Sequence, residues 1–569
     1  MSVRPADWPP PWSPREAIRP PTDAADERIE VGFLVVGAGP AGLAAAIRLG
    51  QLMEEDPATA ARLGDVPVAV LEKGKAPGSH LLSGAVVNPR GLRRLFGDRK
   101  RIDELPFYGP VDGESVVFLT KRRSVRIPTP PTMVNRHNYV ASLSRLGRFL
   151  AEEAESLGVT VLPETAAENL LVDGGRVVGV RTGDRGRGRN GEELSNFEPG
   201  SDITARVTIL CEGTQGHLTG AALDRFGLHG ESPQVWALGV KEVWKVPKPL
   251  REVVHTMGWP LRAGRKYREF GGSFIYPMGD DMVTIGMVVG LDYRDAELSV
   301  HDLLQELKTH PRVRSILDGG ERVQWGAKTI PEGGFVAFPR RFHAPGLLLC
   351  GDGVGLVNVP ALKGIHYAIE SGRLAAEAAW RTLERGVSTR AALTTYDDAI
   401  RSSFIWNDLR EVRNMRQAFG RGFYLGGALA GAMTATKGRF PGGDSRTEPD
   451  GEQPLFTTDR AQAYPAPDGQ LTFDKLSSVF ASGNRTRDDQ PNHIRVQTNV
   501  PRELALAWAR MCPAQVYEVG APDGHDAAGN ETVEVKLAPS NCVQCGAITA
   551  KGGRLTPPEG GSGPEYTLT

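Results

Sequence analysis

"VGFLVVGAGPAG", residues 31–42, decides the fold of this chain. Val31–Val36 is a short apolar run, typical of a buried strand in a parallel sheet. It leads directly into a glycine-rich turn of the pattern G-x-G-x-x-G, made by Gly37, Ala38, Gly39, Pro40, Ala41 and Gly42. Gly37 permits a tight turn, Gly39 lets the backbone approach a pyrophosphate, and Gly42 allows close packing of helix on strand. The stretch therefore predicts a dinucleotide-binding unit whose helix directs its N-terminus at phosphates.

An acidic residue follows the next predicted strand. Val68–Leu71 is apolar and ends at Glu72, where a carboxylate accepts hydrogen bonds from a ribose in this type of fold. An insertion, QLMEEDPATAARLGDVP at residues 51–67, lengthens the connection between the glycine turn and Glu72. We interpret the insertion as a longer surface connection that leaves the sheet intact.

Two later segments favour FAD over NAD. Gly346–Cys350 is another apolar strand candidate, followed by Gly351 and Asp352 and then by a predicted helix at Lys363–Ala375. In many flavoproteins an Asp in this position lies near the ribityl and diphosphate groups. Val207–Cys211, before a Glu-Gly turn, has the pattern of a strand that returns to the FAD domain. The alternative is that these glycines only form turns. Three such segments in this order nevertheless predict an FAD-binding domain.

The intervening segments are expected to build a second domain. Val159–Leu162, Arg176–Arg181 and Met282–Val289 are strand candidates, and Tyr139–Leu157 has the periodicity of a helix that ends at Gly158. We predict that these strands form a mixed sheet covering the flavin.

Composition excludes several classes of protein. A chain of 569 residues is too long for one hydrophobic core, so about two to four packed units are expected. The 67 Lys and Arg residues nearly balance 68 Asp and Glu residues, and no basic stripe carries interleaved aromatics, so nucleic-acid binding is set aside. No apolar run reaches the length of about eighteen residues that a membrane span requires. The Pro-rich opening lacks the pattern of a signal or transit peptide, and we interpret it as a loose tail.

Three cysteines near the end of the chain need an explanation of their own. Cys542 and Cys545 have C-x-x-C spacing, Cys512 precedes them in a Cys-Pro context, and Ile548 stands where another thiolate would be expected. Four interpretations remain: an iron–sulfur cluster, a tetrahedral zinc with a distant His such as His525, a redox disulfide, or vestigial cysteines. The thiol contexts favour a cluster.

A cluster with three thiolates can take two forms. It can be a three-iron (3Fe-4S) cluster, or a four-iron (4Fe-4S) cluster with a non-Cys fourth ligand, whose last iron takes water, hydroxide or an oxygen side chain such as Thr549.

The sequence resembles the electron transfer flavoprotein:ubiquinone oxidoreductase family over roughly residues 30–569. The resemblance is carried by GAGPAGLAAAIRL (37–49), LEKG (71–74), LLSGAVVNP (81–89), GVKEVW (239–244), HTMGWPL (255–261), GGSFIYP (271–277), VNVPALKG (357–364), DGQLTFDKLSSVFASG (468–483), CPAQVYE (512–518) and PEGGSGPEY (558–566). Family members carry a fourth cysteine where this chain has Ile548.

The resemblance implies an α/β (α+β overall) fold. A Rossmann-like FAD-binding domain would carry an inserted mixed-sheet quinone-binding domain and be followed by a ferredoxin-like iron–sulfur domain. The expected limits are a flexible N-terminal tail at 1–28, the FAD-binding domain at 29–125, 206–230 and 336–450, a mixed segment of the FAD and quinone domains at 126–205, the ubiquinone-binding domain at 231–335, and the iron–sulfur cluster domain at 451–569.

The resemblance also implies an activity and the residues that support it. Such an enzyme, an electron-transferring-flavoprotein dehydrogenase, takes electrons from reduced electron transfer flavoprotein through an iron–sulfur cluster and FAD to ubiquinone or another quinone. This relay assigns no catalytic acid or base. The implied FAD-binding residues are Gly37, Gly39, Pro40, Ala41, Gly42, Glu72, Lys73, Gly351, Asp352 and Gly364; the quinone head would bind at Gly271 and Gly272, and Cys512, Cys542 and Cys545 would hold the metal cluster. Without the resemblance, the two glycines at 271 and 272 would be interpreted as a strand bulge.

Two segments are candidates for membrane contact. Phe423–Ala435 (FYLGGALAGAMTA) is apolar but too short to span a bilayer, and a membrane-surface helix over 423–436 would match the family. A helix buried in the protein is the alternative, because Gly and Ala are weak bilayer anchors. The stretch around Leu81–Leu95 is the other candidate. We expect weak, monotopic, peripheral association, on the cytoplasmic face of a bacterial inner membrane.

Two rival functions remain open at this point. Prenyl reductases and aromatic hydroxylases share the FAD architecture, although the C-terminal cysteines count against them. A flavoprotein carrier that has lost quinone turnover is the other alternative.

Overall fold

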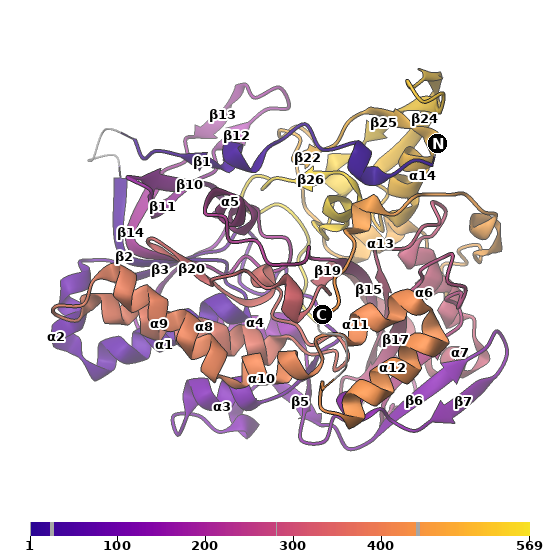
Figure 1. Cartoon of the computed structure of the whole chain (residues 1–569), viewed down its shortest axis with the longest axis horizontal. Helices are drawn as coiled ribbons and strands as arrows, with labels where there is room; N and C mark the ends of the chain where they lie inside the picture. Colours follow the sequence, from indigo (N-terminus) through magenta and orange to yellow (C-terminus); the bar gives the residue numbers. More distant parts are fainter. Residues whose placement is uncertain (1, 23–27, 280, 440–443) are drawn as a thin grey trace.

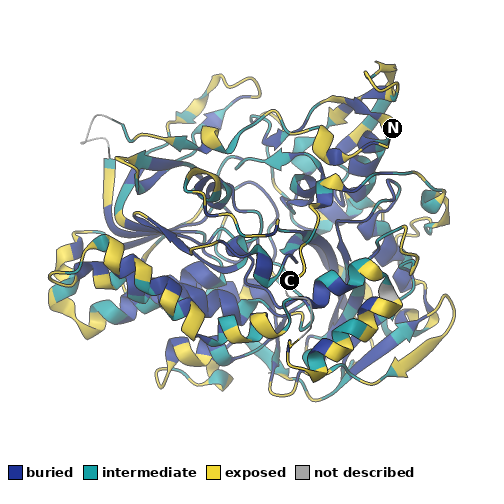
Figure 2. Cartoon of the chain, viewed as in Figure 1, coloured by how far each residue is buried: buried dark blue, intermediate teal, exposed yellow. Residues whose placement is uncertain are grey.

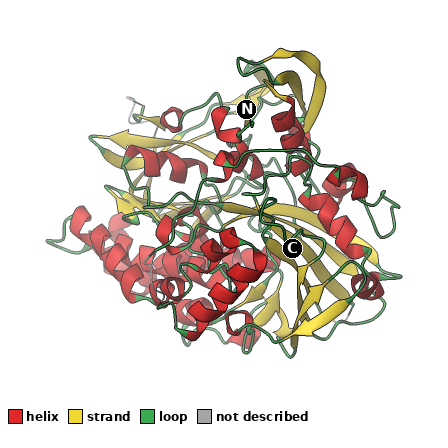
Figure 3. Cartoon of the chain, turned by 45° about the vertical axis from the view of Figure 1, so that its right-hand side comes forward, coloured by secondary structure: helices red, strands yellow, loops and turns green. Residues whose placement is uncertain are grey.

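The computed structural model describes residues 2–22, 28–279, 281–439 and 444–569. Within these residues a nine-stranded sheet and a seven-stranded sheet lie beside each other (Figure 1). Most α-helices gather next to the nine-stranded sheet, as the turned view in Figure 3 shows. The mixed α/β architecture confirms the predicted fold class, with its Rossmann-like part and a second, mixed sheet.

The nine-stranded sheet contains the dinucleotide-binding unit predicted from the sequence. Its central strands β14, β2, β3 and β9 run parallel, and β21 joins β14 in the same direction. Its strands are β1 (Ile18–Arg19), β2 (Arg28–Val36), β3 (Val68–Leu71), β9 (Thr160–Leu162), β10 (Ala167–Asp173), β11 (Arg176–Thr182), β14 (Asp202–Leu210), β20 (His343–Ala344) and β21 (Leu347–Leu349). Because β2, β3, β14 and β21 are parallel, their carboxyl ends meet at one edge.

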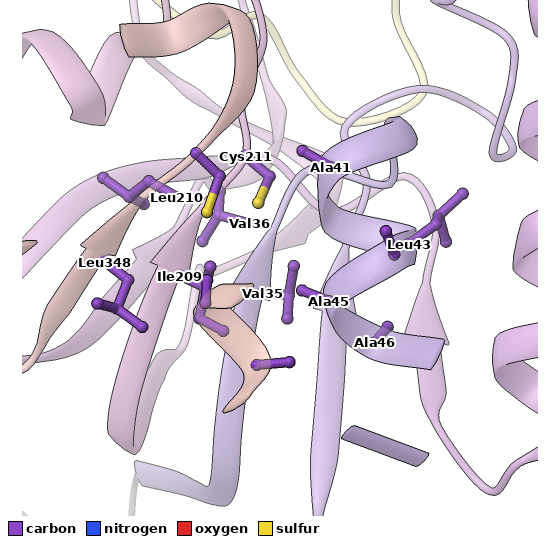
Figure 4. Packing of buried hydrophobic residues seen from close by; sticks show 14 of the residues in the cluster. Val35, Val36, Ala41, Leu43, Ala45, Ala46, Ile209, Leu210, Cys211 and Leu348 are labelled. Carbon is purple, nitrogen blue, oxygen red and sulfur yellow. The ribbon is translucent and has the colours of Figure 1, made fainter. Parts of the chain in front are cut away.

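Helices cover this sheet, and two of them, α1 (Pro40–Glu55) and α8 (Ile365–Trp380), pack so closely that their backbones are in contact. A Cβ at Gly372 of α8 would collide with the backbone of Ala41 in α1, so only glycine permits this crossing. Figure 4 shows the apolar core beside it, where Val35 of β2, Ala45 of α1 and Ile209 of β14 lie together. The helices are α1 (Pro40–Glu55), α2 (Pro57–Ala60), α3 (Arg90–Phe96), α4 (Leu143–Ser156), α5 (His217–Arg225), α8 (Ile365–Trp380), α9 (Thr389–Ser402) and α10 (Phe404–Glu411).

The seven-stranded sheet has the order β19-β15-β18-β17-β16-β6-β7. Its strands are β6 (Glu114–Leu119), β7 (Ser124–Ile127), β15 (Trp236–Lys245), β16 (Val253–Gly258), β17 (Gly271–Pro277), β18 (Met282–Gly290) and β19 (Glu321–Pro331). The helices α6 (Val300–Lys308) and α7 (Pro311–Leu317) lie beside it (Figure 1). Two small sheets precede the C-terminal region: β4 (Val86–Val87) and β5 (Phe107–Pro110) both pair with β8 (Tyr139–Ala141), and β12 (Arg185–Arg187) pairs with β13 (Glu193–Glu198).

The C-terminal region shares its core with the seven-stranded sheet. Trp508 and Cys512 belong to the same cluster of buried side chains as Trp325 of β19. The region is therefore packed firmly against the sheet. Its elements are α13 (Lys475–Ala481), β22 (Ile494–Arg495), β23 (Asn499–Pro501), α14 (Arg502–Met511), β24 (Tyr517–His525), β25 (Glu531–Leu537) and β26 (Arg554–Leu555).

The structure distributes several strands differently from the prediction. Strands β9 and β11, expected in the sheet that covers the flavin, belong to the nine-stranded sheet, where β9 pairs with β3 and β11 with β14. Only β18 of the three expected strands lies in the seven-stranded sheet. Conversely β6 and β7 lie in that sheet, because β6 pairs in parallel with β16, although residues 29–125 were assigned to the FAD-binding domain.

The N-terminal segment is packed where a flexible tail over residues 1–28 was expected. The amide of Leu455 donates to the carbonyl of Val3 at 2.8 Å, and β1 pairs in parallel with β10. The Trp12 ring lies 5.3 Å from the ring of His217 in α5. Residues 2–22 therefore lie across both the FAD-binding part and the C-terminal region, because their apolar side chains find partners there. Residues 1 and 23–27 lie outside the described residues.

An apolar helix lies at the surface. The short helix α11 (Met415–Ala418) precedes α12 (Phe423–Ala435), and Figure 2 shows much of α12 exposed. Leu425 of α12 is 54% exposed. Across the described ranges, no helix combines the length and apolar character needed to cross a bilayer.

Candidate redox site

A cavity of about 1120 Å³ lies between the carboxyl ends of the parallel strands and the seven-stranded sheet. Val36, Leu71, Cys211 and Cys350, at the ends of β2, β3, β14 and β21, line one part of it. The strands β15, β16, β17, β18 and β19 line the other part. Ligands of open α/β sheets bind at the carboxyl ends of the strands, so we call this space the large cavity and regard it as the binding site.

The glycine turn is shaped by contacts that exclude side chains. Gly37 has a φ of 104°, and a Cβ there would come within 2.5 Å of the carbonyl oxygen of Cys211. A Cβ at Gly42 would collide with the carbonyl of Gly37. The carboxylate of Glu72 accepts hydrogen bonds from the amides of Ala38 at 3.1 Å and Gly74 at 2.7 Å. Glu72 therefore fixes the turn that the sequence assigned to a pyrophosphate.

The predicted FAD residues converge on the large cavity. Gly37, Gly39, Pro40, Ala41, Glu72, Lys73, Gly351, Asp352 and Gly364 all line it, whereas Gly42 packs behind the turn. The N-termini of α1 and α8 both open onto it, which suits anionic groups. Burial raises the pKa of the Asp352 carboxyl to about 6.

The residues present fit a bound FAD. His80 and Gln215 both line the large cavity; the His80 ring has the backbone of Ser562 as a partner, whereas both side-chain amide atoms of Gln215 are buried without a hydrogen-bond partner among the described residues. Buried polar groups are normally paired, so these atoms indicate a polar ligand. Sequence reasoning missed both residues, because an isolated His or Gln in a loop carries no pattern.

The predicted quinone glycines lie on β17 and also line the large cavity. A Cβ at Gly272 would come within 2.6 Å of the carbonyl oxygen of Thr256, and one at Gly271 would collide with the carbonyl of Val288. The ladder between β17 and β18 runs from Gly271 to Pro277 without a register shift. The pair is therefore part of a regular strand, and the alternative of a bulge is wrong.

The large cavity reaches from the glycine turn to the surface helix. Phe270 and Phe419 line it, and so do Gly427, Ala430 and Thr434 of α12. Part of α12 is thus a boundary of the cavity and part is exposed, which suits an entrance for an apolar ligand.

The three C-terminal cysteines surround a second, small cavity. Cys512 follows α14, and Cys542 and Cys545 lie in the loop after β25. The amide of Val516 donates to the Cys512 sulfur at 3.5 Å, and that of Gln544 to the Cys542 sulfur at 3.4 Å. Burial, and then the Cys512 thiolate, raises the pKa of Cys545 to about 12. Burial and the Cys545 thiolate likewise raise the pKa of Cys542. Because their pKa values are raised, these thiols need a nearby cation to become thiolates.

The surroundings of the small cavity fit an iron–sulfur cluster. Besides the cysteines it is lined mainly by apolar residues, including Ile548, with Tyr517 as a polar exception. His525 is exposed on β24 and is not part of the lining, which removes the expected fourth zinc ligand. Among the described residues no group of three His, Cys, Asp or Glu side chains is placed to hold a metal ion. A cluster, which spreads its ligands around several irons, suits three separated thiolates.

Thr549 does not lie where the sequence suggested. It lines the large cavity, on the opposite side of its loop from the sulfurs, while Ile548 lines the small cavity. The prediction of Thr549 as an oxygen ligand is therefore not supported, because adjacent residues of this turn point to different cavities.

The cysteine loop separates the two cavities. The carbonyl of Cys545 accepts hydrogen bonds from the amide and the hydroxyl of Thr329, both at 2.9 Å, and Thr329 lines the large cavity. Gly546 lines both cavities. The ammonium of Lys73 donates to Gln544 Oε1 at 2.5 Å, so this predicted FAD residue also reaches the cysteine loop. One layer of backbone thus lies between a dinucleotide site and a thiolate site.

Comparisons with known proteins agree with this arrangement. The family model "ETF-QO, ubiquinone-binding" matches residues 236–330, which span β15 to β19, and the model "Electron transfer flavoprotein-ubiquinone oxidoreductase, 4Fe-4S" matches residues 469–567. The electron transfer flavoprotein-ubiquinone oxidoreductase of Arabidopsis thaliana is 39% identical, with 96% of this chain and 86% of that protein covered. The enzyme of that name from Pseudomonas aeruginosa is 36% identical, with 95% and 99% covered.

A solved structure shares the fold at lower identity. A geranylgeranyl bacteriochlorophyll reductase-like protein from Thermoplasma acidophilum is 18% identical, with a TM-score of 0.55 over 73% of this chain and 92% of that one.

Proposed function

The chain belongs to the electron transfer flavoprotein-ubiquinone oxidoreductase family, and we propose that it reduces ubiquinone with electrons from reduced electron transfer flavoprotein. It is an oxidoreductase, as its relatives are. The observation that carries the proposal is the Cys545 loop, which separates a thiolate site from a dinucleotide site by one hydrogen-bonded layer.

FAD and an iron–sulfur cluster would supply the redox chemistry, since a cluster passes single electrons and a flavin stores two. The chain binds and orients them. The glycine turn and the N-termini of α1 and α8 would hold the FAD phosphates, and the Gly271–Gly272 strand would let a quinone approach the backbone. Lys73 and Lys328 lie near the thiols, and their charges favour thiolates and an anionic cluster.

The function is tested by steady-state reduction of a short-chain ubiquinone by reduced electron transfer flavoprotein. We expect robust turnover that depends on both FAD and iron content. Reduction driven by NADPH or NADH without the flavoprotein would instead support a prenyl reductase or hydroxylase. Electron uptake without quinone reduction would indicate a flavoprotein carrier, and the proposal would be wrong.

We further propose that one iron of the cluster has no cysteine ligand, because Ile548 occupies that side of the small cavity. The cluster is then a four-iron form with an exchangeable iron or a three-iron form. In oxidised protein, from which an exchangeable iron is lost, replacing Ile548 with cysteine is expected to raise iron content toward four per chain and to remove the EPR signal of an oxidised three-iron cluster. Ile548→Ala, which opens similar space without a thiol, is the control. Equal iron content and spectra in both variants would refute the proposal.

We propose that α12 contacts a membrane surface, which for a bacterial chain would be the cytoplasmic face of the inner membrane. The support is its apolar sequence, its exposure and its contribution to the wall of the large cavity. The second candidate, Leu81–Leu95, is not available for this role. Leu92 and Leu95 are buried in the core, and Leu81 and Leu82 line the large cavity.

Replacing Leu425 with glutamate should weaken membrane binding. Burial of a leucine side chain contributes about 1.5–3 kcal/mol, so its loss lowers the partition constant by about tenfold or more. Vesicle sedimentation measures this, and activity with a water-soluble quinone should remain. Ile29→Glu, at a residue of β2 with a similar exposed fraction of 49%, is the matched control. Equal binding of the two variants would contradict a role for α12.

A further inference from the structure

Lys241 lies in a row of five residues that crosses the seven-stranded sheet. Backbone pairing places Gly326 of β19, Lys241 of β15, Gly286 of β18, Phe274 of β17 and His255 of β16 directly opposite one another in turn. Directly opposed residues of an antiparallel sheet share one face. Lys241, Phe274 and His255 all line the large cavity, so this face is the cavity face.

Glycines on both sides of Lys241 make room for an apolar enclosure. A Cβ at Gly326 would collide with the Leu82 side chain, and one at Gly286 would collide with the ring of Phe274. The space beside the lysine stem is thus filled by Leu82 and the ring of Tyr566 on one side and by Phe274 on the other. Lys241 is 1% exposed, and its ammonium donates to the carbonyl of Ser83 at 2.7 Å. The structure holds this amine in one place at the edge of the large cavity.

No carboxylate compensates this buried amine. In the described part of the chain, burial alone lowers the pKa of Lys241 to about 7. The titratable groups that line the same cavity include His80, His255, Tyr276, Lys328 and Lys363, and also Glu72, Lys73, Glu212, His217, Glu332, Asp352 and Arg416. His255 and Tyr276 satisfy each other through a hydrogen bond of 2.7 Å, and burial lowers the pKa of His255 to about 3. Burial also lowers the pKa of Lys328 and of Lys363, in each case to about 8, so among these three lysines Lys241 has the pKa closest to neutral pH.

The lysine lies near the strand glycines assigned to the quinone. The adjacent row of the sheet runs from Gly239 of β15 through Val288 to Gly272 of β17, and all three residues line the large cavity. Lys241 follows Gly239 by two residues, so it projects from the same face about 7 Å further along the strand. A quinone ring lying over the glycine row would have its oxygen within reach of the Lys241 ammonium.

We propose that Lys241 is a catalytic residue that donates a proton to a carbonyl oxygen of the quinone during its reduction. The proposal rests on the proposed function. A quinone becomes a quinol by taking two electrons, which the reduced enzyme supplies, and two protons. One N–H bond of the Lys241 ammonium breaks, one O–H bond forms on the quinone, and the amine is left neutral. Solvent supplies the second proton and the proton that restores the ammonium.

The test compares two electron acceptors. Ubiquinone analogues need protons, whereas the ferricenium ion takes one electron and no proton. Replacing Lys241 with methionine, which is similar in length and uncharged, is expected to lower kcat for quinone by about 100-fold or more, the usual contribution of a proton donor. Reduction of ferricenium should change less than twofold. Lys245→Met, at an exposed lysine of the same strand, is the control for both acceptors.

The pH profile gives the second measurement. The ammonium carries the proton below its pKa, so wild-type kcat for quinone should fall tenfold per unit above about pH 7. Lys241→Met should lack this slope. Lys241→Arg keeps the charge but does not release a proton, so it should bind quinone and still turn over slowly. A wild-type ratio of the two acceptor rates in Lys241→Met, or the same pH slope, would overturn the proposal.

Quinone binding separates this inference from the proposed function. The oxidised holoenzyme should bind a short-chain ubiquinone several-fold more tightly at pH 6 than at pH 9, because the ammonium donates to the carbonyl, and Lys241→Met should show no pH dependence. If wild type binds quinone in this way but does not reduce it, the proposed function fails while the lysine contact stands. If binding is independent of pH in wild type, the lysine contact fails. FAD content verifies that each variant is folded.

Discussion

Replacing Cys545 with serine is expected to remove the iron–sulfur cluster and to abolish quinone reduction by electron transfer flavoprotein. The three thiolates lie around one small cavity and have no fourth cysteine beside them, so loss of one leaves too few ligands for a stable cluster. We expect a loss of more than about 100-fold in activity, since even residues outside the ligand set cost about 10–100-fold at metal sites. Iron and acid-labile sulfide should fall to background while the flavin absorbance remains.

A nearby oxygen side chain provides the matched control. Thr549 lies four residues from Cys545 but lines the large cavity, so Thr549→Ala should keep full iron content. If Cys545→Ser retained its iron, the thiolates would not be the ligands. If Thr549→Ala lost iron as well, its hydroxyl would be a ligand after all and the placement of this turn would be wrong.

The second large effect is expected at the glycine turn, where replacing Gly37 with alanine should prevent FAD binding. The φ of 104° at Gly37 is one that L side chains rarely adopt, and the new methyl group would meet the Cys211 carbonyl within 2.5 Å. Such a backbone conformation costs about 1–3 kcal/mol in a non-glycine residue, and an extra methyl in a packed site costs a similar amount, about 1–3 kcal/mol. The backbone of the turn would shift to relieve this contact, and the shift would disrupt the phosphate-binding site.

Flavin content and the free energy of unfolding measure this effect. Purified Gly37→Ala should contain little FAD, and added FAD should bind at least about 30-fold more weakly if about 2 kcal/mol is lost. Gly427→Ala adds the same methyl group on α12, where nothing lies within 4 Å of the new Cβ, and should keep its FAD. Normal FAD binding by Gly37→Ala would show that this turn does not hold the phosphates.

Local patterns accounted for the parts of the fold that depend on neighbouring residues. The strand, glycine turn and helix at Arg28–Glu55 follow from the continuous apolar run at Val31–Val36 and the positions of Gly37 and Gly42. The spacing of Cys542 and Cys545 likewise predicted a thiolate site, and the structure brings Cys512 to it. These features could be predicted because each depends on a few consecutive residues.

Long-range pairing accounts for what the sequence did not reveal. The parallel contact of β6 with β16 joins segments more than a hundred residues apart, and β6 itself is apolar like any strand of the first domain. Lys241 offered only a weak signal, because it is one of three charged residues in strand β15, with Glu242 and Lys245. The enclosure of Lys241 depends on Gly286 and Gly326, which become its neighbours only when the sheet forms.

The attachment of the cysteine loop to β19 has a consequence for how the protein works over time. Thr329 holds the Cys545 carbonyl through two hydrogen bonds, and the C-terminal core is continuous with the sheet. Successive electrons would therefore cross a gap of constant width, with no swinging carrier between the two centres. The slow steps of turnover would be the encounter with the soluble electron donor and the exchange of the quinone. Solvent viscosity would affect the rates of only these two steps.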